Sequence, residues 1–353
     1  MGAKNIKKFI EETGYSFNNK IKLSSLTKLS NNLSIKRIAI DISQLIHRYN
    51  SKDYIISIIK VFNRFKYNNI SPVFVFDGKP PIAKKRVLDK RKKVKQRTLE
   101  KILNFEKKLE EIESNKNLIS TNEYKEKKNS IEIDIKKFKK RTFSIKREHI
   151  QNLKEVFNLL QIPYIHLNFE ADLICALLVK NKIVDACLSD DMDLLAFGCS
   201  IILRDYDLFK NTVSVVIAND ICKKMEINQE QLTYIMIFNG CDYSYKLNNI
   251  NMSYIHTLFK TGKSIKEIFE LIDNQDYNYK EAYGLFTQNI DITIKDIHFN
   301  ELIDKKYRNI NSVEKELYFT LKNNENDTDF FKKSYLTFVN EYINHINTIM
   351  PVI

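Results

Sequence analysis

Two runs of apolar residues near the N-terminus flank a segment with helical periodicity. IKRIAIDISQLI (35–46) is typical of a β-strand that passes into a helix, and SPVFVFDGKPP (71–81) of a strand that ends in an Asp-Gly turn. Between them, DYIISIIKVFNRFKYNNI (53–70) places apolar residues at helical spacing. This strand–helix–strand order predicts a βαβ unit and therefore a parallel sheet.

The rest of the chain continues this alternation after one long polar insertion. We predict the α/β class, with a central parallel-type sheet flanked by helices and a helical insertion. The predicted units are an N-terminal half (1–81), the insertion (82–147), an internal half with further strands and helices (148–219), a helical region (220–272) and an Asn-rich, weakly patterned helical extension (273–353).

The net charge of +13 comes from the insertion and its edges. Residues 79–147 hold 24 Lys and Arg against 10 Asp and Glu, whereas the rest of the chain is close to neutral. A single basic stretch of this kind is typical of a segment that binds a polyanion. The alternative is a solvated helical hairpin whose lysines only maintain solubility, and the charge count alone does not separate the two.

Composition excludes several classes of protein. The chain is 43% hydrophobic and has only 7 Gly and 5 Pro, so it is globular rather than collagenous or disordered. No apolar run approaches the ~20 residues that span a bilayer, and the charged N-terminus lacks the apolar centre of a signal peptide. Five cysteines without a C-x-x-C pair predict buried thiols in a reducing, intracellular compartment.

Acidic residues follow the predicted strands. They are Asp41, Asp77, Glu170 with Asp172, and the group Asp190, Asp191 and Asp193, with Asp242 at the end of an apolar helix. Taken singly, each is explained as a helix cap or a turn residue. Together they fall at one edge of a parallel sheet, where ligands bind. Clustered carboxylates beside a basic segment predict metal-assisted phosphodiester chemistry, with two ions roughly 3.5–4 Å apart.

These motifs resemble those of the flap endonuclease/XPG family of structure-specific 5′ nucleases. The matching stretches are IAIDIS, VFVFDGKPPIAKKRVLDKR, FEADLICALLVKNKIVDACLSDDMDLLAFG and FNGCDYS, in the family's order, within roughly residues 1–270. The resemblance implies a PIN-like nuclease core and a helical arch (82–147) through which, or against which, a 5′ flap is held. It also implies a helix–hairpin–helix region (220–272) that grips duplex DNA.

By the same resemblance, seven carboxylates bind two Mg²⁺ ions, for which Mn²⁺ substitutes. Four of them serve mainly one ion: Asp41, Asp77, Glu170 and Asp172. Asp191 and Asp193 serve the other, and Asp242 acts through water. Asp190, where the family often has Glu, is left out of the ligand set.

The resemblance also assigns contacts to DNA. Lys84 and Arg91, two helical turns apart, lie over the scissile phosphate and neutralise its developing charge. Gly2 lies near the junction, where only glycine fits. Further expected contacts are Lys79, Lys85, Arg86 and Lys90, and His47 takes the place of a tyrosine that stacks on a base.

Three departures from the family pattern accompany the match. His47 replaces the stacking tyrosine, the G-x-G of the DNA-gripping hairpin is replaced by residues 248–252, and the tail has no sliding-clamp box. The stretch KTGKSIKEIF fits the second helix of the helix–hairpin–helix element. These departures and an Ile-, Lys- and Asn-rich composition favour a viral member, such as the poxvirus nucleases of this family.

The sequence thus predicts a Mg²⁺-dependent endonuclease that cleaves 5′ flaps, with 5′→3′ exonuclease action, in DNA replication, recombination or repair. Its partner is DNA with single-strand/duplex junctions, and no membrane is involved. The alternatives are a Holliday-junction resolvase, a 5′ nuclease acting on RNA, and an inactive DNA-binding scaffold. A poxvirus-like member would act in the host cytoplasm, and a cellular one in the nucleus.

Overall fold

A single mixed sheet forms the centre of the protein. The computed structural model describes residues 5–29, 33–49, 54–114, 121–160, 162–247, 250–272, 279–290 and 292. Within these ranges, seven strands pair in the order β1-β7-β6-β5-β2-β3-β4. Their bounds are β1 Lys20–Lys22, β2 Arg37–Asp41, β3 Ser71–Val75, β4 Tyr164–Ile165, β5 Ala186–Leu188, β6 Ile201–Asp207 and β7 Thr212–Ile217.

The middle of this sheet is parallel, which confirms the prediction from the two N-terminal strands. β2 pairs with β3 on one side and with β5 on the other, and β4 and β6 continue the parallel ladder outward. β7 and β1 add antiparallel strands at one edge. β2 lies in the middle of the sheet and is covered on both faces. Its consecutive residues Ile38, Ala39 and Ile40 are therefore all apolar and buried.

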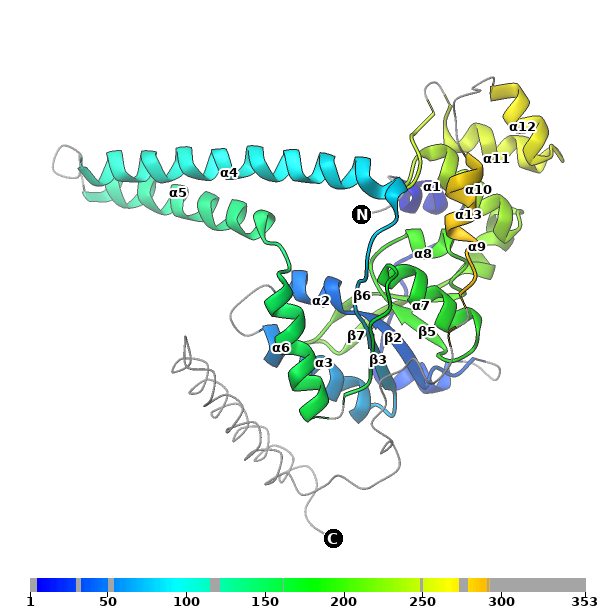
Figure 1. Ribbon diagram of the computed structural model, residues 1–353, viewed down its shortest axis with the longest axis horizontal. Helices are drawn as coiled ribbons and strands as arrows, with labels where there is room; N and C mark the ends of the chain where they lie inside the picture. The colour runs from blue at the N-terminus through cyan, green and yellow to red at the C-terminus, as the bar shows by residue number, and fades with distance from the viewer. Residues whose placement is uncertain are drawn as a thin grey trace, which may run out of the picture.

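Helices cover both faces of the sheet (Figure 1). One layer holds η1 Leu23–Lys28, α2 Ile42–Arg48, α3 Tyr54–Tyr67 and α6 Arg147–Leu159. The other holds α1 Ile6–Glu12, α7 Ala171–Lys180, α8 Asp193–Ala196, α9 Ala218–Met225, α10 Gln229–Asn239, α11 Met252–Lys260, α12 Ile265–Ile272 and α13 Tyr279–Phe286. Successive strand residues face opposite layers, as Ile38 and Ala39 do, so each face has its own hydrophobic core.

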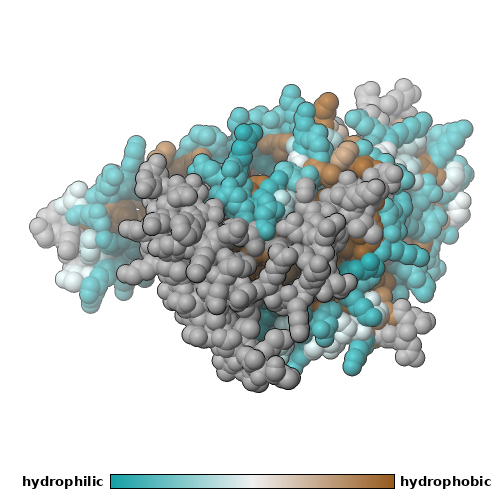
Figure 2. Space-filling model, turned by 60° about the horizontal axis from the view of Figure 1, so that its bottom comes forward, coloured by the Kyte–Doolittle hydropathy of each residue, from teal (hydrophilic) through white to brown (hydrophobic). Residues whose placement is uncertain are grey.

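The basic insertion is a helical hairpin that projects from the body (Figure 1). It consists of η2 Ile82–Lys84, α4 Lys85–Ser114 and α5 Thr121–Thr142. The rings of Phe105 and Phe138 stack with centroids 5.6 Å apart, beside the buried Ile102 and Ile135. These side chains fill the space between α4 and α5, so the two helices pack directly on each other. Hydrophilic side chains are prominent on the part of the hairpin that is visible in Figure 2.

The helices after the sheet differ in detail from the prediction. KTGKSIKEIF was assigned to the second helix of the helix–hairpin–helix element, but its first half is the turn between α11, which ends at Lys260, and α12, which begins at Ile265. Gly262 lies between them with φ of 81°, a left-handed conformation that suits glycine and ends the first helix. Within the altered hairpin, Asn248 and Asn249 lie outside the described residues, as does nearly all of the predicted extension 273–353.

The cysteines and the apolar character of the helices concern the chain as a whole. All five cysteines are buried free thiols, as their number and spacing predicted. Among the described helices, none has the length and apolar character needed to cross a membrane.

Candidate active site

The carboxyl ends of the parallel strands bring the predicted acids to one edge. Asp41 is the last residue of β2, and its Cα is paired with that of Val75, two residues before Asp77. Asp190 and Asp191 follow β5, the other neighbour of β2. Parallel strands therefore carry acids far apart in the sequence to the same place, as the sequence predicted.

Three of these carboxylates are held by backbone N–H groups at helix starts. Asp41 caps α2 and accepts hydrogen bonds from the N–H of Ser43 at 2.9 Å and of Gln44 at 3.4 Å. Asp77 accepts from the N–H of Ala171, the first residue of α7, at 2.9 Å. Asp191 accepts from the N–H of Asp193 at 3.0 Å. The capping explanation is thus correct for Asp41, and the backbone N–H groups fix the direction of all three carboxylates.

The electrostatics of this edge show an excess of negative charge. Burial, then the nearby Asp77 and Asp191, raise the pKa of Asp41 to about 8. Burial also raises the pKa of Asp172 well above its ordinary value, with Asp191, Asp41 and Asp77 adding to the shift. Oδ1 of Asp172 is buried without a hydrogen-bond partner. Four mutually repelling carboxylates with an orphaned oxygen fit a hard dication such as Mg²⁺.

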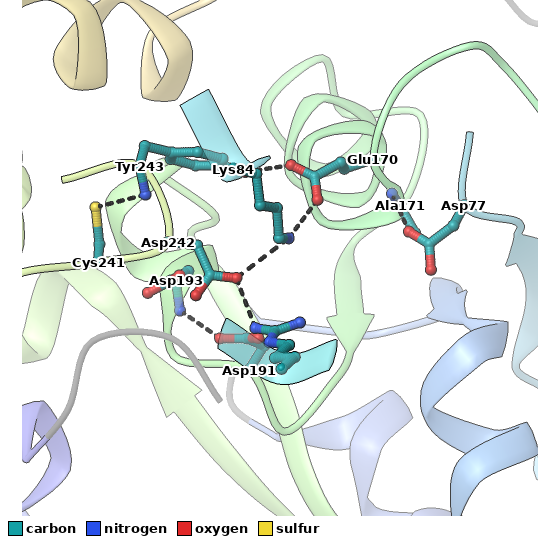
Figure 3. Close-up of polar contacts among 10 residues, drawn as sticks. Asp77, Lys84, Glu170, Ala171, Asp191, Asp193, Cys241, Asp242 and Tyr243 are labelled. Carbon is teal, nitrogen blue, oxygen red and sulfur yellow. Dashed lines mark hydrogen bonds and ion pairs between the residues drawn. The ribbon is translucent and has the colours of Figure 1, made fainter. Parts of the chain in front are cut away.

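Within the described part of the chain, no three acidic, His or Cys side chains already surround one point as a metal site requires. At the other two predicted ligands, Glu170 and Asp242, side chains of the hairpin base supply the positive charge. Lys84 pairs with Glu170 and lies 3.2 Å from Asp242 (Figure 3). Arg91 bonds Oδ2 of Asp242 at 2.8 Å.

Lys84 is the central cation of this group. Burial lowers the pKa of its ammonium, but the carboxylate of Glu170, followed by Asp242 and Asp172, outweighs that effect and raises it. Lys84 and Arg91 share one face of the hairpin base, as their spacing predicted. Both contact predicted metal ligands. Their charged groups therefore lie against carboxylate oxygens where a metal ion would bind.

Tyr243 is a site residue that the sequence reasoning did not select. Its hydroxyl donates a hydrogen bond of 2.6 Å to Oε2 of Glu170, and Lys84 Nζ lies 5.9 Å from its ring centroid. The available signal was its position directly after Asp242 in FNGCDYS. Asp190, left out of the ligand set, pairs with Arg48 and accepts from the N–H of Asp205 at 2.9 Å.

The predicted DNA contacts fall into two groups. Lys79, Lys85 and Lys90 are exposed around the hairpin base. Arg86 instead joins α4 to the loop after α10, because it donates to the carbonyl of Ser244 at 2.8 Å and its guanidinium lies 3.9 Å from the ring centroid of Tyr245. Its role at this joint is structural, whether or not it also meets DNA.

His47 and Gly2 complete the predicted contacts. His47 is exposed at the end of α2 and meets the ring of Phe143 edge-on at 5.6 Å. Partial desolvation of the imidazole by its neighbours lowers its pKa, and Asp77 opposes that shift. Gly2 lies outside the described residues.

The protein thus combines an α/β core, acids at its strand ends and a basic hairpin beside them. Family models match two parts of the chain that carry these features. The model of the XPG N-terminal domain matches residues 1–98, and that of the XPG I-region matches residues 161–242. The chain belongs to the flap endonuclease/XPG family.

Individual relatives agree with this assignment. Flap endonuclease 1 of Danio rerio is 34% identical over 249 residues, which are 67% of this chain and 60% of the relative. Flap endonuclease 1 of Enterocytozoon bieneusi is 30% identical over 227 residues, or 63% of this chain and 58% of the relative. The match therefore spans about three fifths of the length of these relatives.

Solved structures share the fold at lower identity. Flap endonuclease-1 from Methanococcus jannaschii superposes with a TM-score of 0.54 at 20% identity, covering 94% of this chain and 97% of that one. Human GEN1 in complex with Holliday junction DNA gives a TM-score of 0.58 at 16% identity, covering 97% and 78%. At such identities the likeness shows the fold alone.

Proposed function

We propose that this protein is a Mg²⁺-dependent, structure-specific DNA endonuclease that cleaves at the base of 5′ flaps, with 5′→3′ exonuclease action. One observation carries the proposal. The mutually repelling carboxylates at the strand ends lie beside a second pair, Glu170 and Asp242, which is neutralised by cations from the hairpin base. Carboxylates and basic side chains at one edge suit cleavage of a phosphodiester.

The proposed chemistry divides the site residues by role. Two Mg²⁺ ions bound by the seven carboxylates would supply a nucleophilic water and stabilise the leaving oxygen. Asp41, Asp77 and Asp191 are already oriented by backbone N–H groups for this task. Lys84 and Arg91 then leave Glu170 and Asp242 and neutralise the charge that grows on the phosphate.

The charge of the hairpin supports a strand-binding role for its base. Residues 79–101 and 135–147 together hold 18 Lys and Arg against 2 Asp and Glu, whereas residues 102–134 hold 6 against 8. Near the outer end, Lys128 bonds Glu113 at 2.8 Å, and farther in Lys139 bonds Glu106 at 2.7 Å. The positive potential is thus concentrated next to the carboxylates, where a strand emerging from the site would pass.

A cleavage panel tests this proposal. The purified chain is mixed with labelled 5′-flap DNA, a four-way DNA junction and a flap containing RNA, each with Mg²⁺ and with EDTA. We expect Mg²⁺-dependent cutting of the DNA flap at its base. Preferred cutting of the junction would make the protein a resolvase, and preferred cutting of RNA an RNA-directed nuclease. Binding without cleavage of any substrate would leave only the DNA-binding scaffold.

The expected cellular location depends on the source of the protein. A viral member would act in cytoplasmic replication sites and a cellular one in the nucleus. Staining of the protein in infected or native cells separates the two.

A further inference from the structure

The end of the sheet opposite to the carboxylates carries positive charge. Short segments lead into the five parallel strands at this end, namely residues 33–37, 66–71, 160–163, 180–185 and 198–200. Together they hold five Lys or Arg and one acid, Asp185. The cations form a set that we call the amino-edge patch: Lys36, Arg37, Lys66, Lys180 and Lys182.

Asp185 offsets only one of these cations. Its Oδ2 accepts hydrogen bonds from the N–H groups of Lys36 and Arg37, both at 2.8 Å, and its Oδ1 lies 3.5 Å from the Arg37 guanidinium. The four lysines of the patch are exposed or half-buried, and within the described ranges none of them forms an ion pair. The patch is therefore a strongly positive surface with its charges directed to solvent.

Lys182 holds a backbone conformation that suits glycine. After α7 ends at Lys180, the N–H of Ile183 donates to the carbonyl of Leu178 and that of Lys182 to the carbonyl of Val179, both at 3.0 Å. This helix ending needs a left-handed residue, and Lys182 has φ of 57°. The helix dipole explains a cation at Lys180. It does not explain a lysine at the left-handed position, where glycine costs less, so binding of an anion accounts for Lys182 better than helix stability does.

The same kind of helix ending presents an exposed tyrosine beside the patch. At the end of α3, the N–H of Ile70 donates to the carbonyl of Phe65 and that of Asn69 to the carbonyl of Lys66, both at 3.0 Å. These bonds fix the turn that carries Tyr67, which is 69% exposed. Tyrosines held in this way are typical anchors of protein interfaces. The patch thus combines charge with one rigid aromatic contact.

The size of the patch decides which polyanion it suits. β5, β2 and β3 are neighbours, so their starting residues span two strand spacings, about 10 Å. The hairpin base, residues 79–101 and 135–147, holds 18 Lys and Arg against 2 Asp and Glu. Because affinity for nucleic acid grows with the number of phosphates neutralised, DNA prefers the hairpin base to the amino-edge patch. A short acidic segment of a protein, with an apolar residue for Tyr67, matches the smaller patch.

We propose that the amino-edge patch docks a short acidic segment of a partner protein. Parallel strands begin at one end of the sheet and carry the carboxylates at the other. A partner held at the amino-edge patch therefore leaves the carboxylates and the hairpin free for DNA. The inference goes beyond the proposed function and does not depend on it.

A peptide titration tests the proposal. The probe is a fluorescein-labelled peptide of Glu residues with one central Phe, and its binding is followed by anisotropy in EDTA at physiological salt. It is titrated with the free protein and with protein saturated with 5′-flap DNA, which covers the hairpin base. We expect the peptide to bind both. The combined variant Lys36→Gln, Lys180→Gln and Lys182→Gly should weaken peptide binding to the flap-saturated protein about tenfold and leave flap affinity unchanged.

The matched control removes the same charge from the hairpin base. The combined variant Lys90→Gln, Lys92→Gln and Lys93→Gln should weaken flap binding and keep the peptide affinity of the flap-saturated protein. Tyr67→Ala should weaken binding of the peptide with Phe and not of a peptide of Glu alone. If thermal melts show that the amino-edge variant is misfolded, Lys182→Gly alone decides, because glycine relieves the left-handed backbone.

Two results would overturn the inference. Unchanged peptide binding by the amino-edge variants would leave the patch as a solvated surface only. A loss of flap affinity larger than the loss of peptide affinity would make it a nucleic-acid surface. If the flap binds nowhere, the nuclease proposal fails, and the titration of the free protein still decides on the patch.

Discussion

At the scale of single residues, the acids of this site do two jobs at once. Asp41, Asp77 and Asp191 each accept a backbone N–H, and the first of them caps α2. Capping stabilises the fold, whereas crowding of charges destabilises it. Sequence reasoning could find both roles for each acid but not their balance, because the balance depends on burial and on neighbours brought in by the sheet.

Asp41→Asn separates the two roles, since Asn is as good a cap as Asp. Burial and like charges raise the pKa of Asp41 from 3.8 to about 8 in the folded state. A raised carboxyl pKa makes the folded state bind more protons than the unfolded state between about pH 4 and 8, so stability falls as pH rises through that window. In EDTA, Asp41→Asn should therefore unfold at a higher temperature than the wild type at pH 8, with little difference at pH 4.

Calorimetric or fluorescence melts at both pH values provide the measurement. Asp205→Asn is the matched control, because Asp205 is exposed and its φ of 51° suits Asn. A lower melting temperature for Asp41→Asn at pH 8 would show that the capping charge, not repulsion, dominates at this position.

Lys84→Ala tests the cation that neutralises Glu170 and Asp242. Both carboxylates are nearly buried, and removing one partner of a buried ion pair leaves an uncompensated charge. In EDTA we expect a loss of about 3 kcal/mol in the free energy of unfolding. Mg²⁺ should restore part of it, because the proposed function has the ion bind the same oxygens.

Denaturant unfolding with and without Mg²⁺ checks this expectation, with Lys60→Ala at an exposed position of α3 as the control. The single-turnover cleavage rate at saturating flap should also fall, since in the proposed function Lys84 neutralises charge that develops in the transition state. An unchanged rate together with normal stability would mean that Lys84 serves neither role.

At the scale of elements, the charge and periodicity of the sequence predicted the hairpin but not the contacts within it. The sequence located the basic segment and its helices, because polar helical periodicity and Lys content are local properties. It could not show that Phe105 stacks on Phe138 or that Lys139 pairs with Glu106, since these contacts join positions 33 residues apart in sequence across two helices. Likewise, the division of KTGKSIKEIF between α11 and α12 depends on a left-handed glycine that sequence periodicity does not show.

The basal and outer parts of the hairpin should differ in salt dependence. Replacing the basal Lys90, Lys92 and Lys93 by Ala should weaken flap binding and reduce the slope of log affinity against log salt by about 0.7 for each phosphate that is no longer neutralised. Replacing the outer Lys107, Lys108 and Lys125 removes the same formal charge from a part of the hairpin that is slightly acidic overall. The outer variant should keep the wild-type slope, and equal slopes for both variants would exclude a strand path confined to the base.

At the scale of the whole molecule, the fold joins three distant parts of the chain into one site. The sheet edge supplies acids from β2, β3 and β5, the hairpin supplies Lys84 and Arg91, and the loop after α10 supplies Asp242 and Tyr243. The parallel order was predictable, because strand–helix–strand patterns have one common solution. The ion pair between Arg91 and Asp242 was not, because 151 residues separate them and only the folded chain brings them together.

The central claim is that the carboxylates at the sheet edge hold the ions that drive cleavage. The most direct test compares single-turnover cleavage of a 5′ flap at saturating Mg²⁺ by the wild type, Asp191→Asn and the control Asp205→Asn, with flap affinity measured in parallel. We predict that Asp191→Asn loses at least a hundredfold in rate while its affinity is kept or increased, because less negative charge faces the phosphate. A loss of less than about tenfold, or ~1.4 kcal/mol, would contradict the metal assignment.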